Sequence, residues 1–203
     1  MTLHTPLPRS ASATTPLEIY RSTKTYDHTE GLSCCFRQWR ASHSHCRLLH
    51  GYALAFKFVF ATYELDERNW CFDFGGLKPV KAWLKEMFDH TLLIAEDDPE
   101  RATLEGLADK GLVALRILPA VGCEATARYV HAYVARFVED QTSGRVWLES
   151  VEVREHGGNS ALSKPLPYVV RSTERWHLRY GQVYRKDLEG RIASIIRRAP
   201  LRA

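Results

Sequence analysis

The chain has 203 residues, 45% of them hydrophobic and 26% charged, so it is long enough to bury the core of one domain. Its net charge of +4 is too small to indicate a nucleic-acid-binding protein, and no run of about 18 apolar residues predicts a transmembrane helix. Five cysteines, an odd number in which Cys34 and Cys35 are adjacent, argue against a disulfide framework and favour the cytoplasm.

The amino-terminal half predicts an arm followed by two strands. Residues 1–17 are rich in proline, serine and threonine without an apolar stretch, so we expect a flexible arm and no signal peptide. A first strand is predicted over 32–41 and a second over 51–65. In the second strand, period-two alternation places one set of residues on a single face: Tyr52, Leu54, Phe56, Phe58 and Phe60.

The next segments predict two main helices and a further strand. Apolar residues recur at helical spacing over 77–88, with Asp73 as the expected cap, and again over 123–140. Between them, residues 95–120 predict a short acidic helix and a short apolar strand. A strand over 144–156 changes phase near Glu149–Ser150, which predicts a β-bulge. Two strands before paired helices favour an α+β fold, with the helices on one face of an antiparallel sheet.

Three histidines lie within eight residues, at His43, His45 and His50. Imidazole is a good zinc ligand, and three protein ligands with one open position are typical of a catalytic zinc site. Cys46 lies inside this segment. The alternative is a polar loop that is rich in histidine by chance.

Two carboxylates elsewhere in the chain are further candidates for functional residues. Asp89 immediately precedes His90, and a carboxylate beside an imidazole can fix its tautomer and raise its basicity. The alternative is a histidine that interacts with the end of the preceding helix. Glu155 ends a predicted strand, a place where a lone carboxylate is usually solvated.

Five short segments, in this order, resemble the 6-pyruvoyltetrahydropterin and 6-carboxytetrahydropterin synthase family. In that family they read Cys-x3-His-Gly-His, Asp-Phe-x2-Leu-Lys, Leu-Asp-His-x2-Leu-Asn, Pro-Thr-Ser/Ala-Glu-Asn and Val-x-Val-x-Glu-Thr. The resemblance covers roughly residues 32–162. Here the segments are CRLLHGY, CFDFGGLKPVKAWL, FDHTLL, GCEATARYV and VEVREHGGNSA.

The resemblance implies a T-fold domain over residues 18–162, with an insertion at about 95–118 and an extension over 163–203. In a T-fold, a four-stranded antiparallel sheet carries two helices on one face, and chains join edge to edge into a barrel. We therefore expect a homo-oligomer, specifically a hexamer. The implied substrate is 7,8-dihydroneopterin triphosphate, and the implied cofactor is Zn²⁺.

Matched residue by residue, Cys46 takes the place of the family's general base, and Asp89 with His90 that of its partner dyad. Glu155 takes the place of the glutamate that anchors the pterin ring. Cys123 and Glu124 fall at the pterin-contacting corner, where Cys123 replaces a small hydroxyl residue.

The metal ligands depart from the family pattern. One zinc-binding histidine should come from the first strand and two from His-Gly-His. The first-strand position falls near Arg40, Tyr52 replaces the last histidine, and His50 alone remains. We therefore expect His45, with His43, to replace the missing ligands.

Three functions remain open. The first is a 6-carboxytetrahydropterin synthase step leading to queuosine-type bases, and the second is a 6-pyruvoyltetrahydropterin synthase-type lyase on the same substrate. The third is a non-catalytic pterin- or purine-binding protein. For the basic, aromatic C-terminal extension, we expect a packing arm against a neighbouring subunit rather than a nucleic-acid surface.

Overall fold

The computed structural model describes residues 18–165 and the backbone of three short strands at 176–179, 182–186 and 192–195. These strands are β9 (Trp176–Arg179), β10 (Gln182–Lys186) and β11 (Ile192–Ile195), which pair in the order β11-β10-β9. The predicted arm at 1–17 lies outside the described residues, as do the side chains of the C-terminal extension beyond residue 165. No helix within the described residues is long and apolar enough to cross a membrane.

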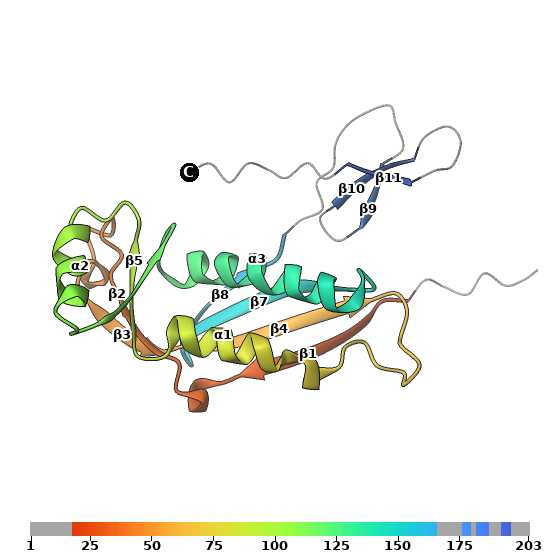
Figure 1. Cartoon of the computed structure of the whole chain (residues 1–203), viewed down its shortest axis with the longest axis horizontal. Helices are drawn as coiled ribbons and strands as arrows, with labels where there is room; N and C mark the ends of the chain where they lie inside the picture. The colour runs from red at the N-terminus through yellow and green to blue at the C-terminus, as the bar shows by residue number, and fades with distance from the viewer. Residues whose placement is uncertain (1–17, 166–175, 180–181, 187–191, 196–203) are drawn as a thin grey trace, which may run out of the picture.

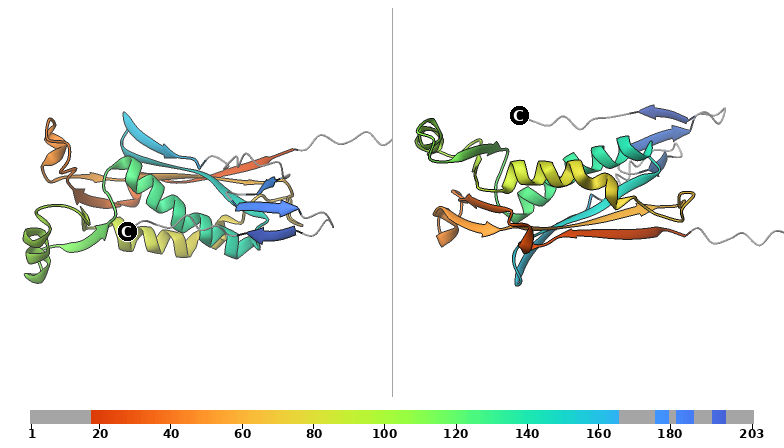
Figure 2. Two further views of the ribbon diagram at one scale, coloured as in Figure 1. Left: turned by 90° about the horizontal axis from the view of Figure 1, so that it is seen from above. Right: turned by 60° about the horizontal axis from the view of Figure 1, so that its bottom comes forward.

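The main sheet has four strands in the order β1-β4-β7-β8, and every neighbouring pair is antiparallel. Two helices lie together on one face of this sheet (Figures 1 and 2), which confirms the predicted α+β architecture. The strands are β1 (Tyr20–Tyr26), β4 (Ala55–Thr62), β7 (Val146–His156) and β8 (Asn159–Ser163), and the helices are α1 (Lys78–Phe88) and α3 (Cys123–Thr142).

The core lies between the helices and the main sheet. Phe56, Phe58 and Phe60 alternate along β4 and are fully buried, as the period-two pattern predicts. The register of β4 with β7 shifts where Glu149 is the extra residue, so the predicted bulge is confirmed. Asp73 caps the short helix η3 (Phe74–Leu77) that leads into α1, and its carboxylate accepts a hydrogen bond from the Gly75 N–H at 2.8 Å.

A second sheet stands at one end of the main sheet, in the order β3-β2-β5-β6. Strand β2 pairs antiparallel with β3 and parallel with β5, which pairs parallel with β6. A small core of Leu92, Ile94 and Leu104 joins it to the helix α2. The elements are β2 (Ser33–Phe36), β3 (His50–Ala53), β5 (Thr91–Ala95), β6 (Ala114–Leu118), α2 (Arg101–Asp109) and the short helices η1 (His28–Glu30) and η2 (His45–Arg47).

Two strand predictions need correction. The strand predicted over 32–41 ends at Phe36, and the one predicted over 51–65 is divided at Leu54 into β3 and β4, which belong to different sheets. The Leu54 N–H donates to the Leu32 carbonyl at 2.9 Å, and its side chain is buried. Leu54 is therefore the point at which the chain passes from one sheet to the other.

Candidate functional site

Cys46 lies in the helical turn η2, which is held by hydrogen bonds on both sides. The Ser44 hydroxyl accepts a hydrogen bond from the Cys46 N–H at 3.2 Å, and the Cys46 carbonyl accepts one from the Gln38 N–H at 2.7 Å. The second bond ties the turn to the segment that leaves β2. The Cys46 side chain is half-buried at the end of the second sheet.

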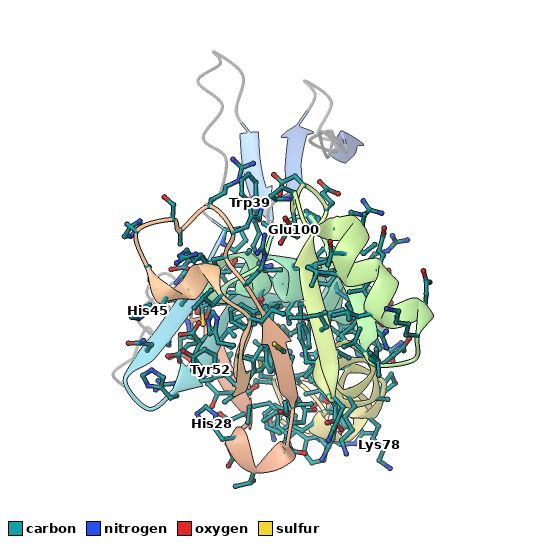
Figure 3. The ribbon with its side chains drawn as sticks, turned by 90° about the vertical axis from the view of Figure 1, so that its left-hand side faces the viewer. His28, Trp39, His45, Tyr52, Lys78 and Glu100 are labelled. Carbon is teal, nitrogen blue, oxygen red and sulfur yellow. The ribbon has the colours of Figure 1, made fainter. Side chains whose placement is uncertain are left out.

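Strand β3 places His50 and Tyr52 on the same face. Their rings meet edge to face, with centroids 5.5 Å apart. His50 Nδ1 lies 2.7 Å from the Leu48 carbonyl. Because a carbonyl only accepts, Nδ1 carries the proton, and Nε2 of the neutral ring is left with its lone pair. Figure 3 shows Tyr52 below the turn that carries His45, beside the hairpin of β7 and β8.

Glu155 comes from the end of β7, at a second bulge. Val151 and Val153 alternate along β7 as buried residues under α3, and Glu155 continues this alternation beyond them. The register of β7 with β8 shifts between Arg154 and His156. Glu155 is therefore the extra residue of this bulge and has no partner in β8.

The amino terminus of α3 brings Cys123 to the same place. Its thiol lies 3.7 Å from the Val153 carbonyl, to which it donates. Burial first, and then the negative charges of Glu155 and Glu124, together raise the pKa of Cys123 to about 12, so Cys123 is a neutral thiol at physiological pH. Glu124 itself is exposed in the first turn of α3.

Gly122 lies where the beginning of α3 approaches the segment that follows β2. It has φ of +105°, and a Cβ at this position would stand 2.3 Å from the Gln38 side-chain nitrogen. The positive φ is what favours glycine where α3 begins, because the Gln38 amide is the end of a flexible side chain and could move away.

Tyr52 connects these groups. Burial raises the pKa of its phenol first, and the acidic groups of Glu155, Cys46 and Cys123 raise it further, because a phenolate would repel any of them that is ionised. Its ring packs against His50 and His156. We call this set, Cys46, Tyr52, Cys123 and Glu155, the β3–α3 corner. Its four side chains come from four separate elements: η2, β3, α3 and β7.

The predicted metal ligands do not assemble. His43 and His45 are exposed, and within the described residues no three His, Cys, Asp or Glu side chains are placed to share a metal ion. The set of His43, His45 and His50 therefore does not fit a zinc site. Arg40, expected at the first-strand ligand position, instead pairs with Asp97.

Asp89 and His90 form the expected pair, but away from Cys46. His90 Nδ1 lies 2.5 Å from the Asp89 carboxylate, and the His90 side chain is 89% exposed. The His90 N–H donates to the Ser33 carbonyl at 2.7 Å, at the beginning of β2, whereas the turn with Cys46 is attached beyond its end. Within one chain, the dyad and Cys46 lie at opposite ends of β2.

Two residues of the site were not predicted. Phe36 lies opposite His50 in the register of β2 with β3, with ring centroids 5.0 Å apart. His156 lies beside Tyr52, with ring centroids 6.0 Å apart. Phe36 gives no signal in the sequence because its position depends on strand pairing, whereas His156, next to Glu155, could have been noticed.

Comparison with known proteins gives the same assignment as the motifs. The sequence model of the family described as 6-pyruvoyl tetrahydropterin synthase matches residues 25–165, which is more than half of the chain. A 6-carboxy-5,6,7,8-tetrahydropterin synthase from Rickettsia felis is 38% identical over 56 residues, or 27% of this chain and 41% of the relative. One from Aquifex aeolicus is 28% identical over 98 residues, or 47% of this chain and 60% of the relative. The matched segments thus span less than two-thirds of these curated relatives.

Solved structures share the fold. An uncharacterized protein from Wolinella succinogenes superposes with a TM-score of 0.61 at 22% identity, covering 72% of this chain and 98% of that one. The 6-pyruvoyl tetrahydropterin synthase from Plasmodium vivax superposes with a TM-score of 0.53 at 15% identity, covering 72% and 97%. With the family match over residues 25–165, these results show that the chain belongs to the 6-pyruvoyl tetrahydropterin synthase family.

Proposed function

We propose that the chain is an enzyme of the 6-carboxytetrahydropterin synthase type, a lyase that converts 7,8-dihydroneopterin triphosphate in a pathway to queuosine-type bases. The observation that carries the proposal is the β3–α3 corner, where the ring of Tyr52 packs beside His156, next to Glu155, and the Cys123 thiol donates to the Val153 carbonyl of the same strand. The acidic groups of Cys46 and Glu155 both raise the pKa of Tyr52 there. Membership of the family supports the substrate class. The cytoplasm is the proposed location, which the five free cysteines support.

The proposal assigns the pterin ring to the side of the corner formed by α3 and β7. A neutral pterin presents adjacent N–H donors along one edge, and the Glu155 carboxylate can accept two of them. The neutral Cys123 thiol adds no second negative charge beside this carboxylate. A ring bound at Glu155 would direct its side chain toward Cys46, which we assign as the base that accepts a carbon-bound proton.

We propose that the Asp89–His90 dyad of one chain acts in the active site of a second copy of the chain. Its exposure and its place at the far end of β2 prevent it from reaching Cys46 of the same chain without unfolding the second sheet. An exposed dyad on one chain can instead complete the corner of another. The proposed enzyme is therefore an oligomer with active sites between chains, and an exposed imidazole whose Nδ1 is held by a carboxylate is suited to proton transfer there.

Incubation of the purified chain with 7,8-dihydroneopterin triphosphate, followed by mass spectrometry of the products, tests the proposal. We expect 6-carboxytetrahydropterin. Formation of 6-pyruvoyltetrahydropterin would assign the chain to the sister reaction. Pterin binding without any turnover would replace the enzyme by a binding protein, and absence of both would overturn the substrate class.

A further inference from the structure

Three rings at the end of the second sheet form a triangle, which we call the aromatic triangle: Phe36 from β2 and His50 and Tyr52 from β3. Phe36 lies directly opposite His50 in the strand register. The ring centroids are 5.0 Å apart for Phe36 and His50, 5.5 Å for His50 and Tyr52, and 6.1 Å for Phe36 and Tyr52.

Rings this close are ordinary for packed aromatic side chains, and they are also close enough for three imidazoles at these positions to share one tetrahedral metal ion. With Zn–N bonds of about 2.0–2.1 Å, each imidazole centroid lies roughly 3.2 Å from the metal, and the tetrahedral angle then separates the centroids by roughly 5.3 Å. The three measured separations, 5.0, 5.5 and 6.1 Å, bracket this value. The backbone of β2 and β3 therefore holds three side chains at the distances of a three-ligand metal centre.

The chemistry of the side chains does not match this geometry. A phenylalanine has no donor atom, and a phenol that is neutral at physiological pH is a poor ligand for zinc. His50 alone retains the form of a metal ligand, because Nδ1 donates to the Leu48 carbonyl and Nε2 keeps its lone pair. A single donor side chain does not bind a divalent metal ion strongly enough to compete with water for it.

We propose that the aromatic triangle is a metal-free replacement of a three-ligand metal centre, in which the Tyr52 hydroxyl takes over the contact with the polar side chain of the substrate. The part concerning the substrate rests on the proposed function, whereas the part concerning the metal does not. Tyr52 is suited to this contact because its ring packs against His50 on one side and against His156, the neighbour of Glu155, on another. An uncharged donor there can bind a substrate hydroxyl or carbonyl without a metal ion.

The metal content of variants tests the first part. After exposure to zinc and dialysis, we expect well under one zinc ion per wild-type chain and about one per chain carrying both Phe36→His and Tyr52→His. The single variant Tyr52→His leaves the buried Phe36 in place, and we expect its zinc affinity to exceed that of the wild type at least about tenfold. The matched control is Tyr63→His with Phe74→His, two exposed aromatic residues outside the triangle, which should gain nothing.

Two results would overturn this part. One is a stoichiometric zinc ion in the wild type that is lost in His50→Ala. The other is a failure of Tyr52→His, in a folded chain, to bind zinc more tightly than the wild type and the control, because the rings would then not converge as described.

Pterin binding tests the second part. Affinity for the substrate should be unchanged by treatment of the wild type with a chelator, and Tyr52→Phe should weaken it about threefold to tenfold, as expected for one neutral hydrogen bond. Tyr63→Phe is the control. Unchanged affinity in Tyr52→Phe would remove the hydroxyl from the substrate contact. If the wild-type chain bound neither zinc nor pterin, the proposed function would be contradicted. The conclusion that the aromatic triangle holds no metal would not be affected.

Discussion

Cys46 and Cys123 contribute thiols to the same corner but in different surroundings. Cys123 is buried at the start of α3, and its pKa of about 12 keeps the thiol protonated. Cys46 is half-buried in a turn that is fixed by Ser44 and Gln38. A proton acceptor must be able to ionise, which the buried Cys123 thiol does not do at physiological pH, so we keep the proposed role for Cys46.

Cys46→Ala should therefore abolish turnover while it leaves pterin binding intact. A base acts on the proton only in the reacting step, and we expect kcat to fall at least about 100-fold with the Kd for substrate within about twofold. Cys35→Ala, which removes a half-buried thiol from β2, is the matched control and should keep its activity. Near-normal turnover by Cys46→Ala would show that another group accepts the proton.

Glu155→Gln should affect binding more than folding. A charge-assisted hydrogen bond contributes about 1.5–3 kcal/mol, so we expect the Kd for pterin to rise roughly tenfold to 100-fold. Glu152→Gln on the same strand is the control, because Glu152 pairs with Arg154 at 2.7 Å on the strand's other face. Isothermal titration measures both variants, and equal affinities would place Glu155 outside the pocket.

At the scale of elements, one buried ion pair holds the end of β2 to the segment between β5 and α2. Two nitrogens of Arg37 donate to the two carboxylate oxygens of Asp98 at 2.8 and 2.9 Å, and the Asp98 side chain is fully buried. The Glu100 N–H donates to the same carboxylate at 2.9 Å. The guanidinium of Arg37 holds the pKa of Asp98 below its usual range, although burial opposes this effect.

Asp98→Asn should lower the free energy of unfolding by about 3 kcal/mol, because it leaves a partly buried guanidinium without its counter-charge. Asp97→Asn is the matched control. Asp97 is adjacent and pairs with Arg40 at the surface, where such pairs contribute at most about 1 kcal/mol. Urea denaturation measures both, and equal effects would contradict the role of the buried pair.

The difference in free energy of unfolding between the wild type and Asp98→Asn should depend on pH in one direction. The pKa of Asp98 is lower in the folded chain than in the unfolded chain, so its contribution is fully present above the unfolded value of about 4 and is lost as the pH falls through the folded value. The stability difference between the wild type and Asp98→Asn should therefore shrink as the pH falls below about 4. A difference that grew toward acid would contradict this assignment.

Local patterns in the sequence predicted those elements that depend on neighbouring residues. The spacing of apolar residues located α1 and α3, and the change of phase at Glu149 located the bulge of β7. Strands β1, β5 and β8 were missed, and the division at Leu54 was not foreseen, because pairing with Leu32 determines it. The histidines show the same limit: closeness in sequence suggested a shared metal ion, but strand register placed His50 against Phe36 instead.

At the scale of the whole molecule, the main sheet ends in two strands with free edges. Strands β1 and β8 are the outer members of the order β1-β4-β7-β8, and each has one edge without a strand partner among the described residues. Leu162 on β8 is 63% exposed. Open edges with apolar side chains favour pairing between chains, and a closed ring removes every edge.

We therefore expect a hexamer in solution, which Leu162→Glu should weaken. Leu112→Glu is the matched control, because Leu112 is 67% exposed in the turn between α2 and β6 and lies on no sheet edge. Light scattering at micromolar concentration measures the mass of each. A wild-type monomer at that concentration would contradict assembly, and equal masses for the two variants would place the interface away from β8.

A site shared between chains makes a further prediction for mixed oligomers. Cys46→Ala and His90→Ala should each be inactive alone, because one lacks the proposed base and the other lacks the imidazole of the exposed dyad. When equal amounts are unfolded together and refolded, a site that takes Cys46 from one chain and His90 from its neighbour is intact wherever the two variants meet in the productive order. Random assembly gives this arrangement at about one site in four, so about a quarter of the wild-type activity should return. Separately refolded samples, mixed afterwards, are the control. If Cys46 and His90 served the same site from a single chain, no mixture would contain an intact site, and activity would stay absent in every sample.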